Sequence, residues 1–255
     1  MEFKNISLDI KGNVARLVLK RAPVNVLNIE MMKEMNAALE LVQKAPGLRA
    51  LVFSAEGKFF SAGVDVAEHT KEKVQEMISV FHHIFENLNK LTVPTVAFVQ
   101  GPALGGGCEV ALYCDIVLAS EKAKFGQPEI KVGVFPPIAA FLLPNDIPLK
   151  FAAEMLLTGD TYTAADLRSM GAVNRVFPEA SFAADCEAFL EKITANSSVV
   201  LDLSKQAMRA GHGRPYGKAM PDIEKLYLEK LMATEDANEG LTAFMEKRKP
   251  AWKDK

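Results

Sequence analysis

The feature that most constrains the fold is an alternation of short apolar runs with longer amphipathic segments over the first 180 residues. Residues 50–53 and 95–99 are apolar at nearly every position, as expected of strands that are covered on both faces. The segment between them has apolar residues at every third or fourth position, which is typical of a helix. Strands that alternate with helices form βαβ units, so the sequence predicts an α/β fold with a largely parallel sheet.

Turn and cap residues place the other elements. Residues 6–10 and 14–19 alternate apolar with polar side chains around a turn at 11–13, which predicts a hairpin. A helix is expected from about Ile29 with Asn28 as its N-cap, a second with its apolar stripe between Val74 and Leu88, and further strands at 116–119 and 173–177. From residue 181 the pattern is helical only, with helices expected at 182–193, 199–210, 216–232 and 235–247. We therefore divide the chain into an α/β core, residues 1–180, and a C-terminal helical region, residues 181–255.

Composition narrows the function classes. Thirty basic and 32 acidic residues give a net charge of −2, and a protein that binds nucleic acid is expected to show a basic excess. No apolar run has the length of a membrane span; the nearest, residues 132–143, is interrupted by Pro136 and Pro137. The three cysteines show no CxxC spacing and the four histidines no metal-ligand spacing. Since the N-terminus also has no signal-peptide pattern, we expect a cytoplasmic protein without a metal, a nucleic-acid partner or a membrane anchor.

Two loops follow buried strands, where ligands bind in open α/β sheets. Residues 59–65 read Phe-Phe-Ser-Ala-Gly-Val-Asp, and residues 101–109 read Gly-Pro-Ala-Leu-Gly-Gly-Gly-Cys-Glu before an apolar helix. Glycines that open a helix expose N–H groups to a phosphate or a developing oxyanion. No Lys-Ser or Lys-Thr follows them and the GxGxxG spacing is absent, which disfavours phosphate and dinucleotide loops. An oxyanion site needs a second donor, for which the backbone near Val64 is the candidate; close helix–strand packing also explains the glycines.

Two acidic residues could supply acid–base chemistry. Glu109 lies in the first turn of the expected helix, and Glu129 follows 20 residues later, beyond a predicted strand. Two carboxylates in one cavity, at least one of them desolvated, have separated pKa values and can act as acid and base. A simple helix-stabilising role for Glu109 and a solvated Glu129 remain open. No GxSxG elbow is present, and Cys108 among apolar residues is better explained as a small buried side chain than as a nucleophile.

Taken together, several separated motifs resemble the enoyl-CoA hydratase/isomerase (crotonase) family. They occur in the family's order across nearly the whole chain: residues 21–27, 61–65, 101–109, 125–129, 157–160 and 239–248. The resemblance implies a spiral of ββα units whose C-terminal helical region drives homotrimers, often paired into hexamers. It also implies a lyase that hydrates an acyl-CoA thioester in fatty acid or aromatic compound degradation, with coenzyme A as part of the substrate and no other cofactor.

Residue roles are implied by the same match. The N–H groups of Val64 and Gly106 would form an oxyanion hole, and Glu109 and Glu129 match the two catalytic glutamates. Lys247 would approach the adenine end of coenzyme A from its own or a neighbouring subunit. The remaining residues expected along the substrate are Val24, Val26, Ala62, Asp65, Val66, Gly105, Pro137 and Ile138.

One segment departs from the family pattern. Where typical members have Pro-Gly-Ala-Gly-Gly, residues 136–140 read Pro-Pro-Ile-Ala-Ala. Pro137 has no N–H to offer, and Ile138 adds bulk beside the expected acyl pocket. The stretch resembles members that act on cyclic conjugated esters such as cyclohexa-1,5-diene-1-carbonyl-CoA. The alternatives are an enoyl-CoA isomerase or a CoA-ester hydrolase of the same fold, and a non-catalytic CoA- or RNA-binding member.

Overall fold

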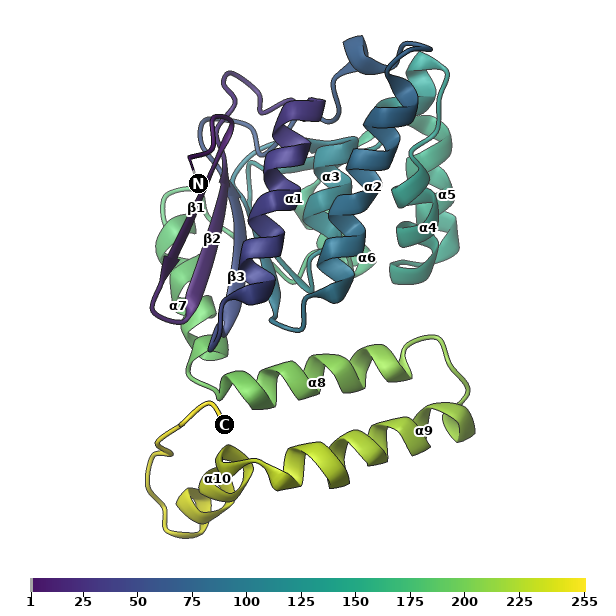
Figure 1. Ribbon diagram of the computed structural model, residues 1–255. Coiled ribbons are helices and arrows are strands. Elements are labelled where there is room, and N and C mark those ends of the chain that lie inside the picture. Colours follow the sequence, from purple (N-terminus) through teal and green to yellow (C-terminus); the bar gives the residue numbers. More distant parts are fainter. Residues whose placement is uncertain (1) are drawn as a thin grey trace.

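The computed structural model describes residues 2–255 and is built around a six-stranded sheet (Figure 1). Its strand order is β1-β2-β3-β4-β6-β9; β1 and β2 are antiparallel and all other neighbours are parallel. The strands are β1 (Ile6–Lys11), β2 (Val14–Leu19), β3 (Ala50–Ala55), β4 (Thr95–Val99), β6 (Ile116–Ser120) and β9 (Arg175–Phe177). The predicted α/β fold, hairpin and central strands are confirmed, although β9 is shorter than the predicted 173–177.

One face of the sheet is covered by α1 (Ile29–Lys44), α2 (Val74–Lys90) and the short α3 (Gly106–Leu112), as Figure 1 shows. The predicted cap of α1 is confirmed, because the Asn28 side chain accepts the N–H of Met31 at 3.1 Å. Leu17 of β2 and Phe53 of β3 are paired in register and fully buried beneath these helices. The main apolar core therefore lies between this sheet face and α1–α3.

Several elements lie outside the predictions. A second, three-stranded sheet consists of β5 (Ala103–Leu104), β7 (Lys124–Gly126) and β8 (Thr161–Thr163). The helix α6 (Ala164–Met170) packs on β7 and β8, while α4 (Pro137–Asp146) and α5 (Leu149–Thr158) pack on each other. Strands of two or three residues are too short to show alternation. The helix α4 is rich in apolar residues and contains Pro144, so no apolar stripe marks it as a helix.

The opposite sheet face packs against α7 (Phe182–Thr194). Cys186 and Leu190 of this helix contact a smaller apolar cluster that includes Val52, Val96 and Leu118 of the sheet. The division of the chain into a core, residues 1–180, and a helical region, residues 181–255, stays a prediction. The first helix of the second region, α7, packs on the sheet of the core.

The remaining helices form a separate layer below the sheet in Figure 1. They are α8 (Ser198–Gly211), α9 (Tyr216–Lys225) and α10 (Glu235–Met245). The predicted continuous α-helix over 216–232 is wrong, because the chain passes into a π-helical turn, η3 (Leu226–Lys230), and a 3-10 turn, η4 (Leu231–Ala233). The predicted end at 247 is also wrong: α10 ends at Met245, and Lys247 takes a left-handed conformation with φ of 54°. No helix within residues 2–255 is long and apolar enough to cross a bilayer.

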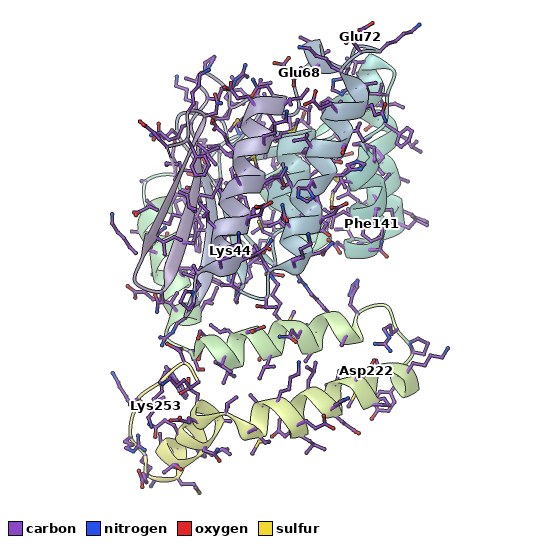
Figure 2. All side chains as sticks on the ribbon, viewed as in Figure 1. Lys44, Glu68, Glu72, Phe141, Asp222 and Lys253 are labelled. Carbon is purple, nitrogen blue, oxygen red and sulfur yellow. The ribbon has the colours of Figure 1, made fainter. Side chains whose placement is uncertain are left out.

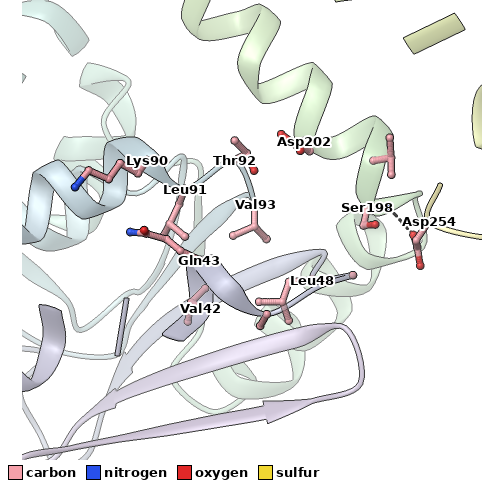
Figure 3. A pocket seen from close by; sticks show the side chains of 13 residues that line it. Val42, Gln43, Leu48, Lys90, Leu91, Thr92, Val93, Ser198, Asp202 and Asp254 are labelled. Atoms are coloured by element: carbon pink, nitrogen blue, oxygen red, sulfur yellow. Dashed lines mark hydrogen bonds between the residues drawn. The ribbon is translucent and has the colours of Figure 1, made fainter. Parts of the chain in front are cut away.

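The helix α8 is tied to the amino-terminal ends of the central strands. Lys205 is 5% exposed; its Nζ donates to the Val93 carbonyl at 2.9 Å and pairs with Asp115. Arg209 donates to the Leu91 carbonyl at 3.0 Å. Beside this junction lies a hollow of about 420 Å³ between the ends of α1 and α2 and the start of α8, where Asp254 accepts the N–H of Ser198 (Figure 3). Neither Glu109 nor Glu129 lines this hollow.

We expect Lys205→Met to lower the free energy of unfolding by about 2–3 kcal/mol, because it leaves Asp115 largely buried without its cation. This loss is smaller than is typical when a fully buried ion pair is broken, because the Asp115 side chain is 26% exposed and still accepts two hydrogen bonds from Thr95. Urea denaturation measures the difference. The control is Lys225→Met, which removes the exposed Lys225–Glu229 pair and should change stability by less than about 0.5 kcal/mol. Equal losses in the two variants would contradict the anchoring role of Lys205.

Candidate active site

Three segments meet where β3 and β4 end: the loops that follow β2, β3 and β4. The loop after β3 lies between the other two. The Leu27 N–H of the first loop donates to the Gly63 carbonyl at 2.8 Å, and the Leu104 N–H of the third donates to the Ser61 carbonyl at 2.9 Å. The Ser61 hydroxyl donates to the Asn25 carbonyl at 2.7 Å, and its oxygen accepts the Gly63 N–H at 3.2 Å. These bonds hold the segments around Val24, Ala62 and Gly105 in one layer.

Glycine is required at the start of α3 because other groups occupy the space of a side chain. A Cβ on Gly105 would lie 2.5 Å from Oε1 of Glu129, and Gly105 has a φ of 50°. A Cβ on Gly106 would lie 2.6 Å from Cγ2 of Val64 and 3.0 Å from the Phe81 ring. The glycines therefore allow close packing, which is one interpretation of the sequence. The side chains that pack against them, those of Glu129 and Val64, are themselves candidate site residues.

Two backbone N–H groups are available at this point. Among residues 2–255, the N–H groups of Val64 and Gly106 have no protein acceptor. The Gly106 N–H belongs to the first turn of α3, where the helix dipole adds partial positive charge. The Val64 side chain lies against the backbone of Gly106, since a Cβ there would be 2.6 Å from its Cγ2. A developing negative charge could be bound here.

Glu109 is held inside the protein by a second helix. It is 2% exposed, and its Oε1 accepts the Ala139 N–H of the first turn of α4 at 2.7 Å. Burial is the main cause that raises the pKa of Glu109, the N–H groups of Ala139 and Ile138 lower it, and the negative charge of Glu129 raises it; the net pKa is about 8. Glu109 is thus a desolvated carboxyl group, as acid–base chemistry near neutral pH requires.

Glu129 faces the same place from the 3-10 turn η2 (Pro128–Val132). Burial raises the pKa of its carboxyl group. Its Oε2 is buried and has no hydrogen-bond partner among the described residues. Since the charge of Glu129 acts on both Glu109 and Cys108, the structure brings the two carboxyl groups together.

The residues expected along the substrate border this layer. The Val24 carbonyl accepts the Ala62 N–H at 2.9 Å, and the Val26 carbonyl accepts from Arg21 at 3.0 Å. Asp65 caps a short 3-10 turn, η1 (Val66–Glu68), and Val66 is 68% exposed.

Pro137 and Ile138 open α4, directly before Ala139. They are half-buried, and Ile138 packs against the main core. The Ile138 N–H acts on the Glu109 carboxyl group together with that of Ala139, and Pro137 directly precedes Ile138 in the chain.

Lys247 is not brought to these residues within one chain. It follows α10, in the layer that packs on the amino-terminal ends of the strands, whereas the glutamates lie at their carboxyl ends. In Figure 2, Glu68 and Glu72 mark the end of the molecule away from the C-terminal helices, and Asp222 and Lys253 mark the layer that contains those helices.

Sequence analysis missed several supporting residues. Ala139 supplies the hydrogen bond to Glu109; the proline at the first helical position was a signal for a helix start there. Gln127 is 1% exposed, and neither polar atom of its side chain has a partner among the described residues, which leaves both available to a bound molecule. Phe81 borders Gly106, which only the packing of α2 on α3 reveals. Within residues 2–255, no group of three His, Cys, Asp or Glu side chains is arranged to hold a metal ion.

Fold and site together define an α/β protein with a buried carboxyl pair beside free backbone N–H groups. The chain belongs to the enoyl-CoA hydratase/isomerase family, whose model matches residues 9–255. It is 36% identical over 248 residues to cyclohexa-1,5-dienecarbonyl-CoA hydratase of Thauera aromatica, covering 97% of this chain and 96% of that protein. It is 34% identical to the mitochondrial enoyl-CoA hydratase of Pongo abelii, covering 96% and 85%. A solved enoyl-CoA hydratase from Bacillus anthracis superimposes with a TM-score of 0.94 at 29% identity, covering 99% and 100%. These structural neighbours confirm the expected crotonase-like fold.

We expect Glu109→Gln to stabilise the protein more at pH 8.5 than at pH 5. With a pKa raised from 4.5 to about 8, native Glu109 keeps its proton where the unfolded chain has lost it. The native state therefore loses stability relative to the unfolded chain as the pH rises from 4.5 to 8, and an uncharged Gln avoids that loss. Urea denaturation at the two pH values measures the gain. The exposed Glu224→Gln is the control, and a gain from Glu109→Gln that is independent of pH would contradict the desolvation of Glu109.

Proposed function

We propose that this protein adds water across the conjugated double bond of an α,β-unsaturated acyl-CoA thioester, with Glu109 and Glu129 as the catalytic pair. The observation that carries the proposal is a Glu129 carboxyl group at Gly105 whose charge raises the pKa of the buried Glu109. Beside it are the Val64 and Gly106 N–H groups, which have no acceptor among residues 2–255. Hydration needs both features: a site for charge on the thioester oxygen and groups that move two protons.

Family membership supports the coarse activity. The relatives are named as enoyl-CoA hydratases over nearly the full length of this chain. Hydration of an enoyl thioester of coenzyme A is accordingly the activity at family level. The residue roles and the acyl group given below are our proposals.

The N–H groups of Val64 and Gly106 form the oxyanion hole. Attack of water on the β-carbon moves electrons onto the thioester oxygen, which becomes negative. Two fixed donors stabilise that charge as it develops, and a donor of this kind contributes roughly 3–4 kcal/mol in other enzymes. The dipole of α3 adds to the effect at Gly106.

The glutamates divide the proton transfers. Glu109 takes a proton from the attacking water, and Glu129 delivers one to the α-carbon; in dehydration the roles exchange. The negative charge of Glu129 raises the pKa of Glu109, so the proton state of one group affects that of the other. With its pKa raised to about 8, Glu109 is mostly protonated at neutral pH, and the Ala139 N–H stabilises the negative fraction that acts as the base. The Oε2 of Glu129, which has no partner among the described residues, suits the protonated form. Isomerisation needs only one carboxyl group, so the presence of both favours hydration.

Coenzyme A would lie along Val24, Val26, Ala62, Asp65 and Val66, with Gly105 at the thioester end. Lys247 reaches the adenine end from another copy of the chain, because its own α10 lies in the layer below the sheet in Figure 1. This supports a homotrimer or a homohexamer. The exposed apolar side chains of α10 include Leu241, Phe244 and Met245, which an interface between copies would cover.

The acyl group that we propose is a cyclic conjugated one, as in cyclohexa-1,5-diene-1-carbonyl-CoA. Pro137 provides no N–H beside Glu109, and the half-buried Ile138 gives this side of the site an apolar surface. The aromatic ring of Phe81 borders Gly106. A flat ring substrate would pack between such surfaces, and the relative from Thauera aromatica is named for that kind of ester.

Replacing either glutamate by glutamine should lower kcat by about 10²–10⁴-fold, since each removes one proton transfer. The KM should change less than threefold, because neither group carries the binding of coenzyme A. Spectrophotometric hydration of an enoyl-CoA measures both constants. The exposed Glu191→Gln is the matched control. Near-normal turnover in both site variants would remove the proposed mechanism.

The cyclic dienoyl ester should have a kcat/KM at least tenfold above that of crotonyl-CoA. Pro137→Gly should narrow this ratio by adding a flexible N–H donor for water near Glu109. Competition between the two esters in one reaction, followed by chromatography, measures the ratio directly. A strong preference for crotonyl-CoA in the unmodified protein would contradict the cyclic substrate and leave the hydratase assignment intact.

A further inference from the structure

We infer that Gly159, in the corner between α5 and β8, is a positioning residue for Glu129. This inference rests on the proposed function, because it concerns how one member of the catalytic pair is held. The corner, residues 158–161, packs against the segment that carries Glu129 and fixes its backbone.

Glu129 needs such support because its carboxylate is not held by any other residue. No side chain or backbone group of another residue in the described chain donates to it, and its Oε2 is buried without a partner. Glu109, by contrast, is fixed by the Ala139 N–H at 2.7 Å. The place of the Glu129 carboxylate is thus set by its own backbone, and by Gly105 on the side facing the site.

The corner supports this backbone on both sides of Glu129. Before it, Gly126 pairs with Thr161 in the antiparallel ladder of β7 and β8. After it, the side chains of Ile130 and Lys131 lie over Gly159: a Cβ there would be 2.8 Å from Cγ2 of Ile130 and 3.1 Å from Cε of Lys131. Lys131 also pairs with Asp160 at 3.0 Å, but both are more than half exposed, so this ion pair contributes little.

A natural control exists in the same protein. Gly159 ends α5 in a left-handed conformation with φ of 66°, and Gly171 ends α6 in the same way with φ of 95°. A Cβ on Gly171 would meet nothing within 4 Å. Alanine at either position introduces backbone strain, but only at Gly159 would its Cβ also press on the Ile130 and Lys131 side chains, which follow Glu129 in η2.

The test compares Gly159→Ala with Gly171→Ala in the full-length protein. We expect Gly159→Ala to lower kcat at least tenfold with KM changed less than twofold, and Gly171→Ala to keep kcat within twofold of the unmodified protein. The melting temperatures of the two variants should fall by similar amounts. Equal kcat values in the two variants, or a loss that follows the melting temperature, would overturn the inference.

Rescue separates steric displacement from general damage. Ile130→Ala removes Cγ2, and since Ile130 is 41% exposed the single variant should stay within twofold of normal activity. Added to Gly159→Ala, it should restore at least half of the lost kcat on a logarithmic scale. Absence of any rescue would overturn the inference, and the double variant also serves if Gly159→Ala alone folds poorly.

A readout without turnover keeps this inference distinct from the proposed function. In crystal structures of the two glycine variants, the Glu129 carboxylate should move away from Gly105 in Gly159→Ala only. If the unmodified protein hydrates neither crotonyl-CoA nor the cyclic dienoyl ester, the proposed function fails. The position of Glu129 in the variants then still decides the inference: an unmoved carboxylate overturns it, and a displaced one supports it.

Discussion

The desolvation of two carboxyl groups at the start of α3 is the constraint on which the rest of the site depends. Removing a carboxylate from water costs several kcal/mol even after the protein relaxes, and here a few backbone N–H groups, chiefly that of Ala139 at 2.7 Å from Glu109, offset part of that cost. The raised pKa of both groups is the consequence. A protein that keeps such a pair gives up stability for groups that exchange protons near neutral pH. The absence of side chains at Gly105 and Gly106 is what allows Glu129 and Val64 to come this close.

The architecture separates the site from the regions that hold the chain together. The buried cluster between the sheet and α1–α3 makes the carboxyl ends of β3 and β4 a rigid base, and the three crossing loops are fixed to each other by backbone hydrogen bonds. The C-terminal helices are attached at the opposite end through Lys205 and Arg209. Contacts in that layer can therefore change, for example on assembly with other copies, without disturbing the glutamates. Glu129 depends instead on the corner at Gly159, where the Ile130 side chain leaves no room for a Cβ.

How much was predictable depends on the length and pattern of each segment. The buried strands β3 and β4 and the long helices α1 and α2 have patterns that extend over many residues, so periodicity identified them. The strands β5, β7 and β8 have two or three residues, and they exist only because neighbouring segments pair with them. The helix α4 has no polar face to mark it, and the π-helical turn after α9 has the same residue types as an ordinary helix. In the site, motif resemblance pointed to Glu109 and Glu129 as candidates, but not to Ala139 or Phe81, whose relevance comes from contacts between distant segments.

The sequence by itself determined the α/β class, the family, and the two loops and two acids in which chemistry could reside, because periodicity, turn residues and motif order are local properties of a chain. Tertiary structure decided which groups face one another. The burial of Glu109 against the first turn of α4, the unbonded Oε2 of Glu129, and the free N–H groups of Val64 and Gly106 all arise between segments tens of residues apart. Desolvation is a property of the surrounding atoms and not of the residue, so no reading of one segment could have supplied it.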